Sequence, residues 1–183
     1  MFLRRLLGRG DRPPASDQKK AREPETETIR RISRELEQVE PELRRYLAGL
    51  AYVLGRVAHA DLNISEDETR KMENIVAEIE GLTEAQAVLV VEIAKHQAEF
   101  YGGTEDYLVT REFARHATPH QRIAAIAACF AVVAIDHAIT AEEYAELTQV
   151  AIELGLTRAE LNDIRRQYSD RLTVIRHMRG ARR

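Results

Sequence analysis

The sequence is poor in the residues that stabilise secreted folds and that form common catalytic motifs. Its 183 residues include a single cysteine, Cys129, and no tryptophan. One cysteine excludes an internal disulfide, so the composition favours a reducing compartment. The chain also lacks HExxH, GxSxG, P-loop and GxGxxG patterns, which excludes the hydrolases, nucleotide-binding and dinucleotide-binding enzymes that carry them. We therefore predict a protein that is not an enzyme.

Long hydrophobic runs are absent as well. The longest apolar run extends from Ile123 to Ile135, well short of the roughly 20 residues that cross a bilayer as a helix. The first residues, Met1 to Gly8, lack the apolar stretch of a secretory signal. We expect a cytoplasmic protein in which the 123–135 run forms a buried core helix.

Charge is distributed unevenly along the chain. Residues 1–22 carry seven Lys and Arg against two Asp, and residues 158–183 carry eight Arg against three acidic residues. The stretch between them, 23–157, has 12 basic and 25 acidic residues. Basic ends on an acidic body predict contact with an anionic surface or between the ends and the body, and the alternative is a pair of solvated basic tails.

The N-terminal segment, residues 1–24, combines a short amphipathic stretch with a linker. Phe2, Leu3, Leu6 and Leu7 share one helical face, and arginines flank them. Residues 1–9 could therefore make peripheral contact with a membrane, although so short a helix is marginal alone and a mobile terminus is the simpler interpretation. Glycines, prolines and charges then predict a flexible linker.

From residue 25 onward the pattern is helical, and no alternating strand pattern of useful length appears. The sequence predicts an all-α bundle of about seven helices over residues 25–178, followed by a basic tail at 179–183. The helix over 121–135 is rich in alanine, which lets other helices approach it closely, so we expect it at the centre. The last helix is expected to carry apolar residues as far as Ile175.

One motif occurs twice. An apolar helix ends at an aspartate, an isoleucine follows three residues later, then a serine or threonine, then a glutamate three further on. The copies are residues 60–68 and 135–143, and each leads through a second helix to Gly-Leu-Thr at 81–83 and 155–157. This repetition predicts two pseudo-symmetric halves, about 45–101 and 119–175, related by an approximate twofold axis.

The motif contains the signals that begin a helix. Ser65 with Glu68, and Thr140 with Glu143, have the spacing of a capping box, in which the hydroxyl and the carboxylate each accept a backbone N–H. Gly81 is expected to end the first of these helices. The carboxylates therefore have a structural role available to them, whatever else they do.

The duplicated motif resembles that of the tellurite-resistance TerB family, whose helical fold also occurs in membrane-anchored DjlA co-chaperones. The family pattern is Ala-Asp-Gly-x-Ile-Ser-x-x-Glu between two helices, given twice, and the resemblance covers about residues 45–170. The usual glycine after the aspartate is Leu62 in the first copy and His137 in the second. The turn is therefore expected to differ from the family's, because glycine adopts positive φ at little cost.

The resemblance implies a non-enzymatic interaction module that binds a protein partner in a stress response of the tellurite or chemical-stress type, in some cases at a membrane. It also implies an alternative, a divalent-cation sensor or sequestration protein. The residues that would hold the cation are Asp61, Glu68, Asp136 and Glu143. Four carboxylates suit a hard divalent cation, whereas the capping roles offer a purely structural explanation. No other cofactor is expected.

Nucleic-acid binding is the remaining class that the sequence raises. The last helix and tail carry several arginines, including Arg158, Arg165 and Arg166. The acidic body, the missing tryptophan and the lack of a recognisable reading motif argue against a nucleic-acid partner.

Overall fold

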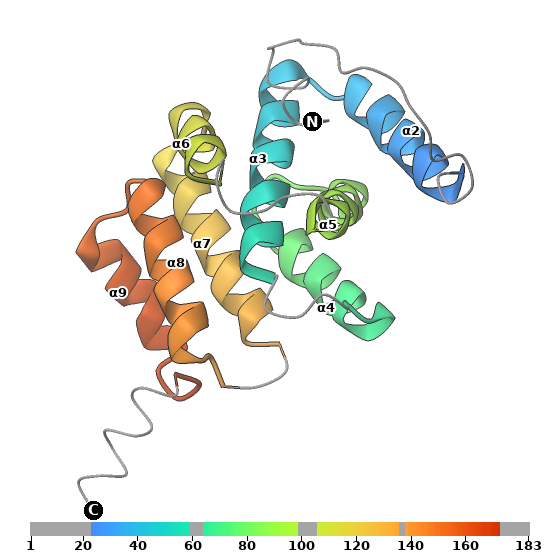
Figure 1. Ribbon diagram of the computed structural model, residues 1–183. Helices are drawn as coiled ribbons and strands as arrows, with labels where there is room; N and C mark the ends of the chain where they lie inside the picture. The colour runs from blue at the N-terminus through green and yellow to red at the C-terminus, as the bar shows by residue number, and fades with distance from the viewer. Residues whose placement is uncertain (1–22, 59–63, 99–105, 136–137, 173–183) are drawn as a thin grey trace, which may run out of the picture.

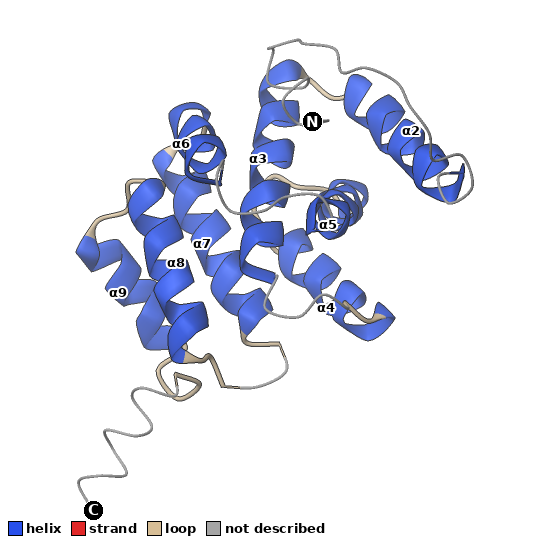
Figure 2. Ribbon diagram, in the orientation of Figure 1, coloured by secondary structure: helices blue, strands red, loops and turns tan. Residues whose placement is uncertain are grey.

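The computed structural model describes residues 23–58, 64–98, 106–135 and 138–172, which form a bundle of eight α-helices (Figures 1 and 2). In chain order the helices are α2 (Glu23–Glu37), α3 (Pro41–Ala58), α4 (Glu66–Ala77), α5 (Glu84–Ala98), α6 (Asp106–His116), α7 (Pro119–Val133), α8 (Ala141–Glu153) and α9 (Arg158–Gln167). No strand occurs among these residues beyond one isolated bridge. The all-α prediction is confirmed, with a helix count close to the expected one.

Two helices form the centre of the bundle. Helix α7 has no exposed residue between 121 and 135, and Phe130 is fully buried, as its alanine-rich sequence predicts. Helix α3 is more deeply enclosed, because every residue from Tyr46 to Gly55 is buried. The sequence indicates only one broad apolar face for α3. Its complete burial follows from tertiary packing, since α5, α6, α7 and α8 all lie against it.

Two glycines allow neighbouring helices to approach α3 closely. A Cβ at Gly49 would lie 2.2 Å from a ring carbon of Phe113 on α6, and one at Gly55 would lie 2.9 Å from the carbonyl oxygen of Ala94 on α5. Neither position has room for a side chain. The cost of glycine inside a helix, about 1 kcal/mol relative to alanine, is outweighed here by the contacts that the close approach permits.

Reciprocal capping begins five of the helices. The predicted boxes at Ser65 and Thr140 are present, and Thr118 caps α7 in the same way with Gln121. Thr157 with Glu160 caps α9, and Thr83 with Gln86 exchanges the same pair of hydrogen bonds before α5. Gly155, with φ of 77°, directly follows the C-cap of α8 in the left-handed conformation that glycine adopts readily. Gly81 has φ of 87°, but α4 ends at Ala77 with Glu78 as its C-cap, so the expectation that Gly81 ends this helix was wrong. The caps that begin α4 and α8 are therefore alike, and so are those that begin α5 and α9, whereas the duplication and the twofold relation between the halves stay predictions.

The last helix is shorter than the sequence predicts. Helix α9 ends at Gln167, residues 168–171 form a turn and Leu172 follows it, so the expected helical continuation to Ile175 was wrong over 168–172. The reason is that Leu172 is buried beside Ile139, with which it forms a parallel bridge. Ile175, residues 1–22 and the basic tail lie outside the described residues. Glu23 and Pro24, expected in the flexible linker, are instead the first residues of α2. None of the described helices is long and apolar enough to span a membrane.

The capping boxes make a first prediction. Ser65→Ala and Thr140→Ala should each lower the free energy of unfolding by about 0.5–2 kcal/mol, because each leaves a backbone N–H at a helix start without its acceptor. Chemical denaturation measures the change. Thr140→Ser keeps the hydroxyl and serves as the matched control. Unchanged stability in both alanine variants would contradict the capping role.

Candidate functional site

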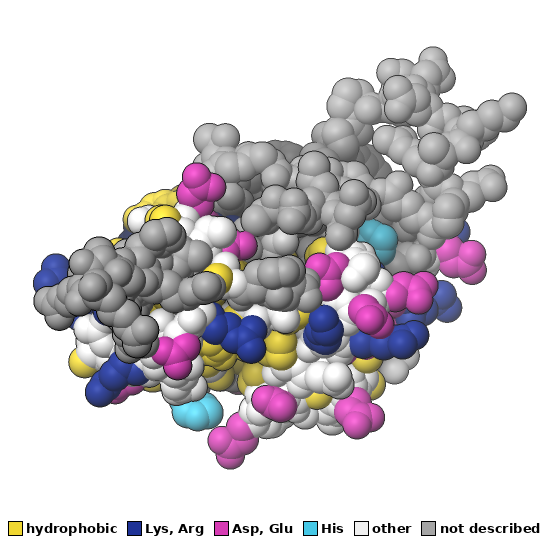
Figure 3. Space-filling view, turned by 90° about the horizontal axis from the view of Figure 1, so that it is seen from below, with side chains coloured by type: hydrophobic (Ala, Val, Ile, Leu, Met, Phe, Trp, Pro, Cys, Tyr) yellow, Lys and Arg dark blue, Asp and Glu magenta, His cyan; other side chains and the backbone are white. Residues whose placement is uncertain are grey.

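The two motif loops connect α3 to α4 and α7 to α8. The C-terminal ends of α3 and α7 lie at the same end of the bundle (Figure 1). Asp61 and Asp136, with the neighbouring His59 and His137, lie outside the described residues, so their geometry stays a prediction. Figure 3, which views the molecule from below, shows acidic and basic side chains interspersed on the described part of that face.

The two motif glutamates are both committed to capping. An oxygen of Glu68 accepts the backbone N–H of Ser65 at 2.6 Å, and one of Glu143 accepts that of Thr140 at 2.7 Å. The boxes leave the second oxygen of each carboxylate for other partners. Among the described residues, no group of three or more His, Cys, Asp or Glu side chains could hold a metal ion. The four-carboxylate site therefore depends on Asp61 and Asp136.

The isoleucine of each motif anchors the end of its loop. Ile139 is fully buried, and Ile64 is half-buried against the same core. At the second loop, the guanidinium of Arg171 donates to the backbone carbonyl of Ala134 at the end of α7. The segment after α9 therefore helps to close this end of the bundle. The isoleucine in the repeated pattern has a packing role, since it returns the chain to the core three residues after the aspartate.

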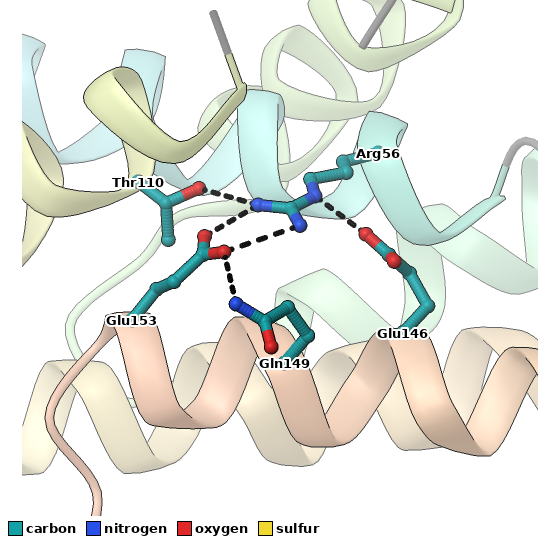
Figure 4. Close-up of polar contacts among 5 residues, drawn as sticks. All are labelled: Arg56, Thr110, Glu146, Gln149 and Glu153. Carbon is teal, nitrogen blue, oxygen red and sulfur yellow. Dashed lines mark hydrogen bonds and ion pairs between the residues drawn. The ribbon is translucent and has the colours of Figure 1, made fainter. Parts of the chain in front are cut away.

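A buried ion cluster lies between α3, α6 and α8 (Figure 4). Arg56, in the last turn of α3, donates from Nε to Glu146 at 2.6 Å and from Nη1 to Glu153 at 2.5 Å. Nη1 also donates to the hydroxyl of Thr110 on α6 at 3.1 Å, and Gln149 donates to Glu153 at 2.9 Å. One guanidinium thus joins three helices that are far apart in the sequence.

The charges in this cluster differ in exposure. The side chains of Arg56 and Glu153 are 10% and 4% exposed, whereas that of Glu146 is 40% exposed. Burial opposes the charged state of Arg56, but the hydrogen bonds and attraction of Glu153 and Glu146 outweigh it and raise the pKa of Arg56. Arg56 is therefore a permanent cation whose charge is balanced inside the protein.

The sequence reasoning missed this cluster, although a signal was present. Arg56 interrupts the apolar end of α3, and Glu146 and Glu153 are seven residues apart, which places them on one face of α8. A lone arginine in an apolar helix requires an acidic partner from elsewhere. Periodicity alone does not say which helix supplies that partner.

Cys129 lies near this cluster but does not act with it. The residue is fully buried in α7. Burial raises the pKa of the Cys129 thiol, and the nearby charge of Arg56 lowers it by less. The thiol is therefore neutral at physiological pH and enclosed by apolar side chains, which makes it unsuitable as a nucleophile.

A search of protein families decides the identity of this bundle. The family model for tellurite resistance protein TerB matches residues 47–166, more than half of the chain. The chain belongs to the TerB family. The match covers α3 from its second turn through most of α9, and it leaves α2 outside. Comparisons with curated proteins and with solved structures gave no match.

The buried cluster makes a second prediction. Arg56→Met should lower the free energy of unfolding of this TerB-family chain by about 3–5 kcal/mol, because it leaves the buried carboxylate of Glu153 without its partner. The double variant Arg56→Met/Glu153→Leu should recover much of that loss, since it removes both buried charges. Denaturant titration of Arg56→Met, Glu153→Leu and the double variant gives the coupling free energy between the two side chains.

The control is Glu146→Gln, which should cost much less because the Glu146 side chain is 40% exposed, against 4% for Glu153. If Arg56→Met and the double variant lost the same free energy of unfolding, the proposed coupling between Arg56 and Glu153 would be wrong.

Proposed function

We propose that this TerB-family chain is a non-enzymatic interaction module that works in a stress-response assembly of the tellurite or chemical-stress type. The observation that carries the proposal is the family match over residues 47–166, in which the named family function is tellurite resistance. We also propose that residues 1–9, which include three arginines and lie outside the described part of the chain, contact a membrane surface.

The chemistry of the described residues supports a binding role. The ion cluster around Arg56 is closed by its own hydrogen bonds, and the thiol of Cys129 is neutral and buried. The role of these groups is to stabilise the folded bundle. Exposed aliphatic side chains occur instead on two packed helices, Leu108 on α6 and Ile152 on α8, which are 63% and 62% exposed. We therefore propose these two positions as part of the surface that contacts a protein partner, and the variants below test them.

The third prediction tests this function in cells. Deletion of the gene should raise sensitivity to tellurite, and the wild-type chain should restore growth. Cys129→Ala should restore it equally, because the proposed role uses no thiol chemistry. Leu108→Glu/Ile152→Glu should fail to restore growth, because charges on these helices would block a protein contact.

Asn162→Glu/Gln167→Glu, at two exposed positions of α9, adds two charges elsewhere and is the matched control for this pair. Circular dichroism must show that each variant is folded. An unchanged tellurite response on deletion, or full rescue by the Leu108/Ile152 variant, would contradict the proposal.

A second candidate function is binding of a divalent cation by Asp61, Glu68, Asp136 and Glu143. One observation favours it, namely that the ion pair between Arg56 and Glu146 joins α3, which leads into the first loop, to α8, which follows the second. The two glutamates are held by their caps at fixed positions. Carboxylates gathered without a cation would repel one another, so a bound cation would stabilise the folded chain.

The fourth prediction separates this candidate from a structural role for the loops. If calcium, magnesium, manganese or zinc binds, added metal should raise the melting temperature. The free energy of unfolding should rise by about 2.7 kcal/mol when the metal concentration is a hundred times Kd. Asp61→Asn/Asp136→Asn should abolish that rise. Asp67→Asn/Glu142→Gln removes the same charge from exposed neighbours and should keep it.

The loops have only a structural role if two results occur together. The aspartate variant is less stable than the wild type, and no metal changes the melting temperature of the wild type.

A further inference from the structure

The five residues after α9 lie at the end of the bundle where α8 begins (Figure 1). Residues 168–171 form a turn, and Leu172 follows it. The backbone N–H groups of Arg171 and Leu172 both donate to the carbonyl of Tyr168, at 3.0 and 3.2 Å, and these bonds hold the turn. We call residues 168–172 the C-terminal strap.

Two residues of the C-terminal strap are attached to α7. The ring of Tyr168 stacks on that of Phe130, which is fully buried in the last turn of α7, with the ring centroids 5.5 Å apart. The guanidinium of Arg171 donates to the backbone carbonyl of Ala134, the C-cap of α7. A cation is favourable at the C-terminal end of a helix, because it offsets the partial negative charge of the last carbonyls. The strap therefore follows α7 to its end.

The third attachment lies on the other side of the second motif loop. Leu172 is 2% exposed and forms a parallel bridge with Ile139, which is fully buried and directly precedes Thr140, the N-cap of α8. The strap is thus attached to Ala134 before the loop and to Ile139 after it. Because Arg171 and Leu172 are consecutive, the two loop ends are held by adjacent residues of one segment.

The corresponding segment of the first half has a different conformation. Thr83 and Thr157 have equivalent places, since each precedes its helix and forms a reciprocal cap with the residue three positions on. Counted from these threonines, Leu172 corresponds to Ala98, because each lies 15 residues further along. Ala98 is the last residue of α5, whereas α9 ends at Gln167. The segment that forms the strap in the second half is therefore helical in the first.

We propose that the C-terminal strap restrains the second motif loop, so that two loops with the same sequence pattern differ in how readily they open. The motif isoleucines show the difference. Ile139 is fully buried and bridged to the strap, whereas Ile64 is half-buried and makes no bridge to any other described residue. A ligand or partner that has to reshape a motif loop in order to bind therefore acts on the first loop more easily than on the second.

This inference does not rest on either proposed function. It concerns contacts within the chain, and it requires neither a protein partner nor a cation. Failure of the tellurite or metal experiments would leave it standing, and its own test uses the protein alone.

The fifth prediction concerns local opening, measured by amide hydrogen exchange with NMR on the full chain. In the wild type, the amide of Ile139 should exchange at least about tenfold more slowly than that of Ile64, because the strap must detach before Ile139 opens. Arg171→Met/Leu172→Ala should speed exchange at Ile139 by at least about tenfold, since it weakens both attachments. Exchange at Ile64 should not change, because opening of the first loop does not involve the strap.

The matched control is Arg166→Met, which removes an exposed arginine that pairs with Asp163 on the same helix. It should change exchange at neither isoleucine. Circular dichroism checks that each variant is folded. If Leu172→Ala prevents folding, Arg171→Met alone keeps the buried leucine and should still speed exchange at Ile139 and not at Ile64.

Two results would overturn the proposal. One is an amide of Ile139 that exchanges as fast as that of Ile64 in the wild type. The other is a strap variant that speeds exchange at both isoleucines by the same factor, because the strap would then contribute only to the stability of the whole bundle.

Discussion

The enclosure of α3 is the constraint on which the rest of the structure depends. A helix buried from Tyr46 to Gly55 must receive neighbours on every side, and two of them come close enough that only glycine fits, at Gly49 and Gly55. Packing at that distance fixes α5 and α6 around the same axis. The one charged group in the last turn of α3, Arg56, then has to find its counter-charge inside the protein.

The elements of the fold that could be predicted from the sequence are those determined locally. Ser65 and Thr140 act through hydrogen bonds within a few residues, and the structure confirms both. Gly81 has the expected positive φ, but it lies beyond Glu78, which is the C-cap of α4. The alanines of α7 indicated its central position for a similar reason, since small side chains permit contact on several sides. Local signals of this kind survive folding because tertiary contacts reinforce them.

What could not be predicted depended on contacts between distant residues. Helical periodicity favoured continuing α9 to Ile175. Leu172 instead forms a bridge with Ile139, a residue from another segment. The partners of Arg56 come from α8 and α6, and no spacing within α3 specifies them. At the candidate cation site, the sequence identified the capping role of Glu68 and Glu143 but not whether Asp61 and Asp136 converge on them.

The separation of Arg56 from Glu153 has a consequence for how the chain is assembled. The two residues are 97 positions apart, one in each of the halves that repeat the motif. A nascent chain that has reached only α5 contains the arginine without its carboxylate, so its first half cannot bury that helix end favourably. The two predicted halves repeat the motif in sequence, but a buried charge of the first requires a carboxylate of the second. We expect the ion cluster to make folding cooperative across the two halves, because the first half cannot complete its interior until α8 has been synthesised.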